Sequence, residues 1–145
     1  MTAYESMQIQ HFMRYVPKDC EWFLLGGPGD ATEAQDMREI RKYMSIVGWE
    51  PWTPFYYLQK ARGFPGLLFN TALWDEPELT LPLFQPGDED RMQQNRCTSL
   101  LQGNPAEVNC TTDTLDYASS RFGPFHNAVL WADVEHSELR ILKGA

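Results

Sequence analysis

The strongest constraint on the fold is an apolar run, residues 20–25, that ends at the turn Gly26-Gly27-Pro28-Gly29. Such a run is typical of a strand buried on both faces, and glycine and proline together end a strand. Asp30 is suited to cap a helix after the turn, with Glu33 completing a capping box. Apolar residues then recur at spacings of three and four, which predicts a helix to residue 47 with Gly48 just past its end. The members of this stripe are Ala34, Met37, Ile40, Met44 and Val47.

The glycine turn is also a candidate ligand site. Glycines let backbone N–H groups approach a ligand, and the start of a helix favours an anion. The turn matches neither G-x-G-x-x-G nor G-x-x-x-x-G-K-[ST], and its acidic neighbours Asp30 and Glu33 oppose a phosphate. Two interpretations stay open, a capped turn without a ligand and a site for a nucleotide or an S-adenosylmethionine-like molecule. The residues assigned to that site are Gly26, Gly27, Gly29, Asp30 and, for stacking, Tyr57.

Residues 7–16 alternate with a period of two. This alternation predicts a half-buried strand, and the turn residues 17–19 would join it to residues 20–25 as a hairpin.

An aromatic and proline-rich stretch follows at residues 49–57. Pro51 and Pro54 argue against a helix, and a three-residue repeat predicts a polyproline-like segment that aligns Trp49, Trp52 and Phe55 on one edge. These aromatic side chains either fill the core or form a stacking or docking surface.

The acidic residues are unevenly distributed. The formal charge is −8, and residues 64–90 hold six of the 20 acidic residues and none of the 12 basic ones. Such a segment attracts basic surfaces and repels nucleic acid, although it also serves solubility alone in many proteins. The leading functional hypothesis is a small binding protein, an inhibitor or decoy, that docks on a basic protein which handles nucleic acid. The residues assigned to this docking surface are Trp49, Trp52, Phe55, Trp74, Asp75, Glu76, Glu78, Asp88, Glu89 and Asp90.

The remaining patterns complete a prediction of the fold. Strands are expected over residues 67–74 and 79–84, helices over 88–102 and 115–122, and a terminal hairpin over 126–134 and 139–142. This order predicts one α+β domain over residues 1–145, with residues 49–90 as an insertion. The expected architecture is a two-layer sandwich with a mostly antiparallel sheet and two or three helices, and a ferredoxin-like arrangement is one way to assemble it.

Three segments near the end of the chain carry a resemblance. Residues 108–110, Leu115 with Ala118, and residues 128–131 resemble the closing strand, helix and strand of small phage-type ferredoxin-like proteins. Enzymes that degrade S-adenosylmethionine belong to that group. The resemblance covers about the last quarter of the chain and does not extend to residues 49–90.

Composition excludes several classes of function. No apolar stretch is long enough to span a membrane, and the acidic charge argues against direct binding of nucleic acid. Three cysteines, without a secretion signal at the start, favour reduced thiols and a cytoplasmic protein. No metal-ligand spacing and no catalytic set stands out, so we expect neither metal nor cofactor. If the protein is an enzyme, Asp133 and Glu107 are the acids we would test.

Overall fold

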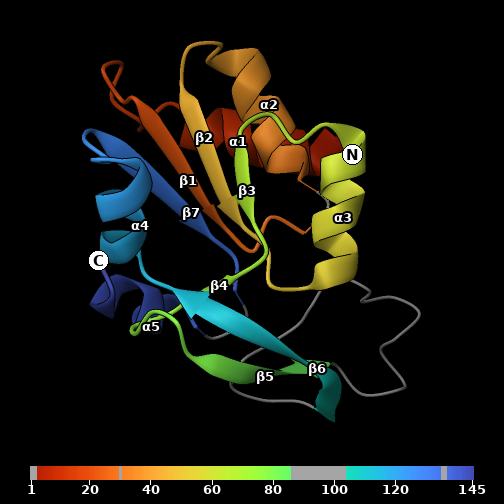
Figure 1. Ribbon diagram of the computed structural model, residues 1–145. Coiled ribbons are helices and arrows are strands. Elements are labelled where there is room, and N and C mark those ends of the chain that lie inside the picture. The colour runs from red at the N-terminus through yellow and green to blue at the C-terminus, as the bar shows by residue number, and fades with distance from the viewer. Residues whose placement is uncertain (1–2, 30, 86–103, 135–136) are drawn as a thin grey trace.

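The computed structural model describes residues 3–29, 31–85, 104–134 and 137–145. In this part of the chain five helices and seven strands are present, and the strands form two sheets (Figure 1). In chain order the elements are α1 (Ala3–Phe12), β1 (Trp22–Gly26), α2 (Thr32–Ile40), β2 (Ser45–Trp49), α3 (Thr53–Arg62), β3 (Leu67–Phe69), β4 (Ala72–Leu73), β5 (Thr80–Gln85), β6 (Asn104–Asp113), α4 (Leu115–Phe122), β7 (Ala128–Ala132) and α5 (Glu138–Lys143).

The larger sheet has the strand order β3-β2-β1-β7, and every neighbouring pair in it is parallel. The smaller sheet, β4-β6-β5, is mixed, because β4 runs parallel to β6 and β5 runs antiparallel to it. The chain is therefore an α+β protein built on a parallel sheet. The predicted mostly antiparallel two-layer sandwich, with its ferredoxin-like arrangement, is wrong. The pairing of β1 with β7 joins residues 22–26 to residues 128–132. A contact between segments so distant in the sequence cannot be predicted from local patterns of residues.

Helix α1 occupies much of the segment for which a strand was expected. Residues 7–16 also contain a helical face, because Ile9, Met13 and Val16 are spaced four and three apart. All three are buried, whereas Tyr15 is exposed. The predicted hairpin is therefore wrong, and β1 pairs with β2 and β7 instead.

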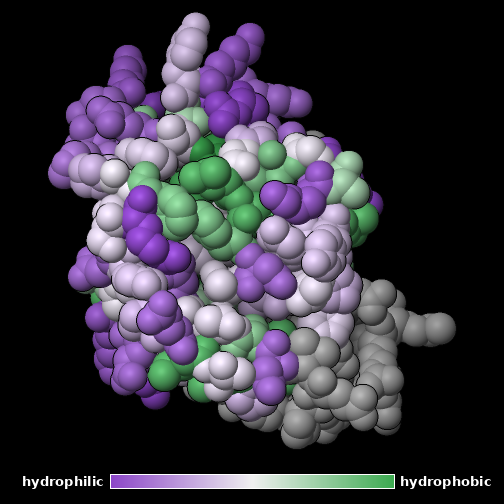
Figure 2. Space-filling model, viewed as in Figure 1, coloured by the Kyte–Doolittle hydropathy of each residue, from purple (hydrophilic) through white to green (hydrophobic). Residues whose placement is uncertain are grey.

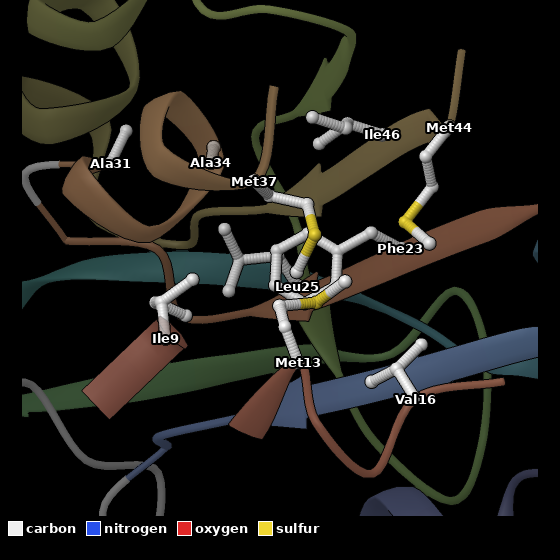
Figure 3. Close-up of a cluster of buried hydrophobic side chains, with 10 residues drawn as sticks. All are labelled: Ile9, Met13, Val16, Phe23, Leu25, Ala31, Ala34, Met37, Met44 and Ile46. Carbon is white, nitrogen blue, oxygen red and sulfur yellow. The ribbon is translucent and has the colours of Figure 1, made fainter. Parts of the chain in front are cut away.

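The two faces of the larger sheet have separate hydrophobic cores. Helices α1 and α2 cover one face (Figure 1). The side chain of Phe23 in β1 belongs to the core between this face and the two helices. Figure 3 shows Met13, Met37 and Met44 around the Phe23 ring. The next residue, Leu24, belongs to the core on the other face, where α4 and α5 pack. Burial on both faces is usual for parallel strands and explains the continuous apolar run of β1.

The face that carries α4 is incompletely covered. Trp49 is fully buried there, with its ring 6.0 Å from that of Phe69 and 6.4 Å from that of Phe125. Near the edge strand β3 this face is less completely covered by other side chains, and Leu67 and Phe122 are exposed. Figure 2 shows hydrophobic side chains at the surface in the upper centre of this view. The sheet thus leaves an apolar strip accessible on this side.

Helix α2 follows the glycine turn, but it ends at Ile40 and not near residue 47. Met44 lies just before β2 and Val47 lies within it, so the predicted helical stripe crosses two elements. Gly48 is a strand residue and not a helix end. A Cβ at this position would lie 2.8 Å from the Phe64 ring, so glycine is required by close packing.

Residues 49–57 do not form the predicted polyproline-like segment. Trp49 ends β2, and α3 begins at Thr53 with Pro54 in its first turn. Proline is compatible with that position because N–H groups in the first turn of a helix have no acceptor within the helix. The argument that Pro54 excludes a helix is therefore wrong.

The second half of the chain agrees with the sequence prediction in part. Strand β5 and helix α4 form close to the expected residues, whereas the expected strand over 67–74 is divided between β3 and β4, in different sheets. The prediction of a terminal hairpin is wrong, because β7 pairs with β1 and the last element is helix α5. The three segments of the resemblance fall on β6, α4 and β7. The strands β6 and β7 belong to different sheets, so they do not pair as neighbours in one sheet. The predicted helix over 88–102 lies outside the described residues.

Candidate functional site

The carboxyl ends of the four parallel strands meet at one edge of the larger sheet. The glycine turn follows β1, Glu50 follows β2, Asn70 follows β3 and Asp133 follows β7. The chain runs from β1 to β2 and β3 on one side of β1, and β7 lies on its other side. Open parallel sheets bind their ligands outside the carboxyl ends of the strands, where the strand order reverses in this way. The glycine turn therefore lies at the edge where a ligand is expected.

The first half of the turn is enclosed by backbone. The N–H of Gly27 donates to the carbonyl of Trp49 at 3.0 Å, and the N–H of Asp133 donates to the carbonyl of Gly26 at 3.1 Å. Gly27 has a φ of 69°, and a Cβ there would lie 2.4 Å from the Asp133 carbonyl oxygen. These glycines allow close packing of three strand ends, and a larger residue at Gly27 would test folding and not ligand binding.

Two side chains form hydrogen bonds with the second half of the turn. The N–H of Gly29 donates to Oε2 of Glu50 at 3.0 Å, and its carbonyl accepts a hydrogen bond from Nε2 of Gln59. Gly29 has a φ of 51°, but no atom lies within 4 Å of the position a Cβ would take. The turn is therefore held firmly at Gly29 and still faces open space there.

Glu50 is a buried carboxyl group that joins two turns. Its Oε1 accepts a hydrogen bond of 2.8 Å from the N–H of Trp52, while its Oε2 accepts the one from Gly29. Asn70 donates from Nδ2 to the Glu50 carbonyl at 2.8 Å and fixes the backbone. Burial raises the pKa of Glu50 from its ordinary value of 4.5 to about 7, although the two N–H groups oppose part of the rise. Glu50 thus titrates near neutral pH.

A cavity of about 410 Å³ opens beside Gly29, between the start of α2 and the end of α3. Gln59 lies in its wall and is only 1% exposed. Its Oε1 is buried and has no hydrogen-bond partner. An unpaired buried acceptor costs about 1–3 kcal/mol, so a donor from a bound molecule would be stabilising. The cavity is lined by Ala31, Thr32, Gln35, Gln59, Arg62, Gly63 and Phe64.

A larger cleft, of about 670 Å³, lies at the opposite edge, near the amino ends of β1 and β2. Arg41 is among its lining residues, and its guanidinium donates to the carbonyls of Val16, Pro17 and Lys18. The described residues that line this cleft include no buried side-chain N or O atom without a partner. The smaller cavity is therefore the better candidate site.

The structure separates the aromatic residues assigned to a docking surface. Trp49 is fully buried and Trp74 is 7% exposed, so neither offers an appreciable area to a partner. Nε1 of Trp49 donates to the buried Asp113 carboxylate at 3.1 Å, which places it in the core. Trp52 and Phe55 are half-buried. Trp49 thus belongs to the core of the larger sheet, and Trp74 is buried directly after β4.

The described acidic residues of the docking surface are partly paired within the chain. Asp75 accepts a hydrogen bond from the Arg140 guanidinium at 2.5 Å, and Glu78 accepts one from the Tyr117 hydroxyl at 2.9 Å. Glu76 is exposed on the same connection between β4 and β5. The other three assigned acids, Asp88, Glu89 and Asp90, lie outside the described residues.

The other residues singled out from the sequence are dispersed. Tyr57 is 65% exposed and does not line the cavity, and Asp133 is exposed beyond β7. Asp30 lies outside the described residues, and α2 begins after Ala31, which makes no side-chain cap. The side chain of Glu107 is likewise outside the description. Neither Asp133 nor Tyr57 therefore lines the candidate cavity.

Cysteines and metal ligands add no reactive centre to the described part of the chain. Cys20 and Cys110 are free thiols, and burial raises the pKa of Cys110 to about 11, which lowers its reactivity. Within the same residues no group of three or more His, Cys, Asp or Glu side chains is placed to hold a metal ion. None of the helices described combines the length and the apolar character needed to cross a membrane.

Two residues of the site, Glu50 and Gln59, were missed by sequence reasoning. Glu50 had a detectable signal, because a carboxylate directly after an apolar strand and before a proline marks the carboxyl edge of a sheet. Gln59 had only its spacing, three residues before Arg62 on a helix that was not predicted.

Comparison with known proteins provides no relative for this chain. No protein family matches it, and neither a curated protein nor a solved structure does.

Proposed function

We propose that the protein binds a small molecule at the carboxyl edge of its parallel sheet, in the cavity between the start of α2 and the end of α3. The unpaired Oε1 of Gln59 in the wall of that cavity carries the proposal. Cavities of this size accommodate small ligands, and a buried acceptor without a donor is unusual in a folded protein. A nucleotide or an S-adenosylmethionine-like molecule is the first class of ligand to test.

The order of the site supports binding without large rearrangement. Glu50 binds the N–H of Gly29 and Gln59 binds its carbonyl. Gln35 donates from Nε2 to the Gly63 carbonyl at 3.2 Å, which joins α2 to the end of α3. A cavity whose walls are tied together loses little conformational entropy when a ligand enters.

Filling the cavity is expected to abolish binding. Gln35→Trp places a large side chain at an exposed position in the wall, whereas Glu39→Trp adds the same side chain one helical turn later, outside this cavity. Adenosine, AMP and S-adenosylmethionine are titrated into ¹⁵N-labelled protein, and amide shifts at Gln35, Gln59 and Gly63 are followed. We expect at least one compound to shift these amides in the wild type and in Glu39→Trp but not in Gln35→Trp. Absence of shifts with all three compounds would contradict the proposal.

A second proposal keeps the acidic segment as a docking surface for a basic protein. It is supported by the exposed Glu76 and by the half-buried Trp52 and Phe55, while the paired Asp75 contributes less free charge. Charge complementarity of this kind governs association rate and specificity, and it weakens with salt.

Charge reversal at Glu76 tests this docking surface with a basic probe. Glu76→Lys is expected to weaken binding of a lysine-rich peptide several-fold at low salt, whereas Glu39→Lys, the same change on α2, should leave it within about twofold. Binding is measured by calorimetry at low and high salt. Equal effects of the two variants would show that the segment acts only through net charge.

A further inference from the structure

We infer that the cavity takes a small molecule which carries both an anionic group, placed beside Arg62, and a hydroxyl or amino hydrogen, donated to Oε1 of Gln59. This inference rests on the proposed function and adds the chemical class of the ligand.

The orientation of the Gln59 amide is fixed by the protein. Its Nε2 donates to the carbonyl of Gly29, so a flipped amide would place Oε1 against that carbonyl oxygen. Oε1 is therefore the acceptor that is left without a partner in this wall residue, and only a hydrogen donor satisfies it. A ligand that offers lone pairs alone, such as an ether or a ketone, does not fulfil this requirement.

In the described part of the wall, which does not include Asp30, one side chain and one helix favour an anion. Among the described residues that line the cavity, Arg62 is the only charged one. Ala31 and Thr32, at the start of the nine-residue helix α2, line the same space, and the positive end of a helix dipole favours an anion. The acidic neighbour Glu33 is engaged with the Thr32 hydroxyl at 3.3 Å and is not part of the lining.

The rest of the wall limits the size and character of the ligand. Ala31 and Phe64 provide apolar surface for a carbon skeleton, and the volume of about 410 Å³ suits a compact molecule. A sugar phosphate or a sugar acid meets all three requirements, with an anion for Arg62, a hydroxyl for Gln59 and carbon atoms for Phe64. The anion can be phosphate or carboxylate, so both are tested.

The experiment compares anionic and neutral probes of the same skeleton. Ribose 5-phosphate is compared with ribose, and AMP, the 5′-phosphate of adenosine, with adenosine, while gluconate shows whether a carboxylate replaces the phosphate. Binding is measured by calorimetry and located by the amides of Gln35, Gln59 and Gly63. We expect an anionic probe to bind at least tenfold more tightly than its neutral counterpart.

Two exposed cations on α3 provide a matched pair of variants. Arg62→Gln removes the charge in the wall, whereas Lys60→Gln removes one that lies over the Tyr56 ring, outside the wall. Arg62→Gln should abolish the tenfold preference for the anion, and Lys60→Gln should leave it within about twofold. Gln59→Met removes the acceptor and keeps a side chain of similar length. This variant should weaken the binding of every probe, provided that its melting curve shows a folded protein.

The outcomes separate the inference from the proposed function. If neutral probes bind at these amides as tightly as anionic ones, or if Arg62→Gln and Lys60→Gln act alike, the inference is overturned and the proposed function stands. If no probe of either charge shifts the amides, both are overturned.

Discussion

Gly27→Ala is expected to lower the free energy of unfolding by about 3 kcal/mol or more. Two effects combine, because Gly27 has a φ of 69° and its Cβ would lie 2.4 Å from the Asp133 carbonyl oxygen. That oxygen belongs to the backbone after β7 and cannot move away without disturbing the contact between β1 and β7. Chemical denaturation followed by circular dichroism measures the loss.

Gly29→Ala is the matched control for Gly27→Ala. Gly29 also has a positive φ, of 51°, but nothing lies within 4 Å of the added Cβ. Only the backbone penalty remains, so a loss of about 1 kcal/mol is expected. If both variants lose the same stability, the close approach of β1 and β7 at this turn does not have the effect assigned to it.

Stability should fall between pH 4.5 and about pH 7 through the titration of Glu50. The folded protein holds the Glu50 proton more tightly than the unfolded chain does, since the pKa is raised from 4.5 to about 7. The contribution is therefore fully present below pH 4.5 and is lost as the pH rises through 7. At about 1.4 kcal/mol for each pH unit between these values, the whole change is about 3 kcal/mol.

Glu50→Gln isolates this contribution from other titrating groups. Glutamine remains uncharged but loses one of the two bonds to Gly29 and Trp52, because its amide nitrogen cannot accept. The variant should be less stable than the wild type at pH 5, and the difference should shrink or reverse by pH 8. Glu76→Gln, at an exposed position, should show no such trend. A constant difference between wild type and Glu50→Gln would contradict the raised pKa.

The sequence predicted the elements that local patterns determine. The apolar run of β1, the glycine turn and the start of α2 could be recognised because the buried faces of a strand and a helix leave distinct periodicities. Residues 7–16 fit both periods, and only packing against β1 selects the helical face of Ile9 and Met13. Pro51 and Pro54 argued against a helix in the sequence, although Pro54 is compatible with the first turn of α3.

The candidate site could be predicted only in part. The glycine turn was identified, but its function was assigned to all three glycines alike. The structure shows that Gly27 is packed against backbone and that Gly29 faces open space. Gln59 reaches Gly29 across 30 positions in the sequence, so its role depends on the arrangement of α3 relative to the turn. The uneven distribution of acidic residues could be read from the sequence. The pairing of Asp75 with Arg140 could not be predicted, because it depends on where α5 packs.

The pairing of β1 with β7 also has a consequence for synthesis of the chain. Residues 22–26 form the strand between β2 and β7, and their second neighbour, residues 128–132, leaves the ribosome more than a hundred residues later. Until then one side of β1 is an unpaired apolar edge, of the kind that promotes aggregation. Contacts between such distant segments also slow folding. We therefore expect chaperone dependence during translation to be greatest before β7 emerges, and to end when this strand joins the sheet.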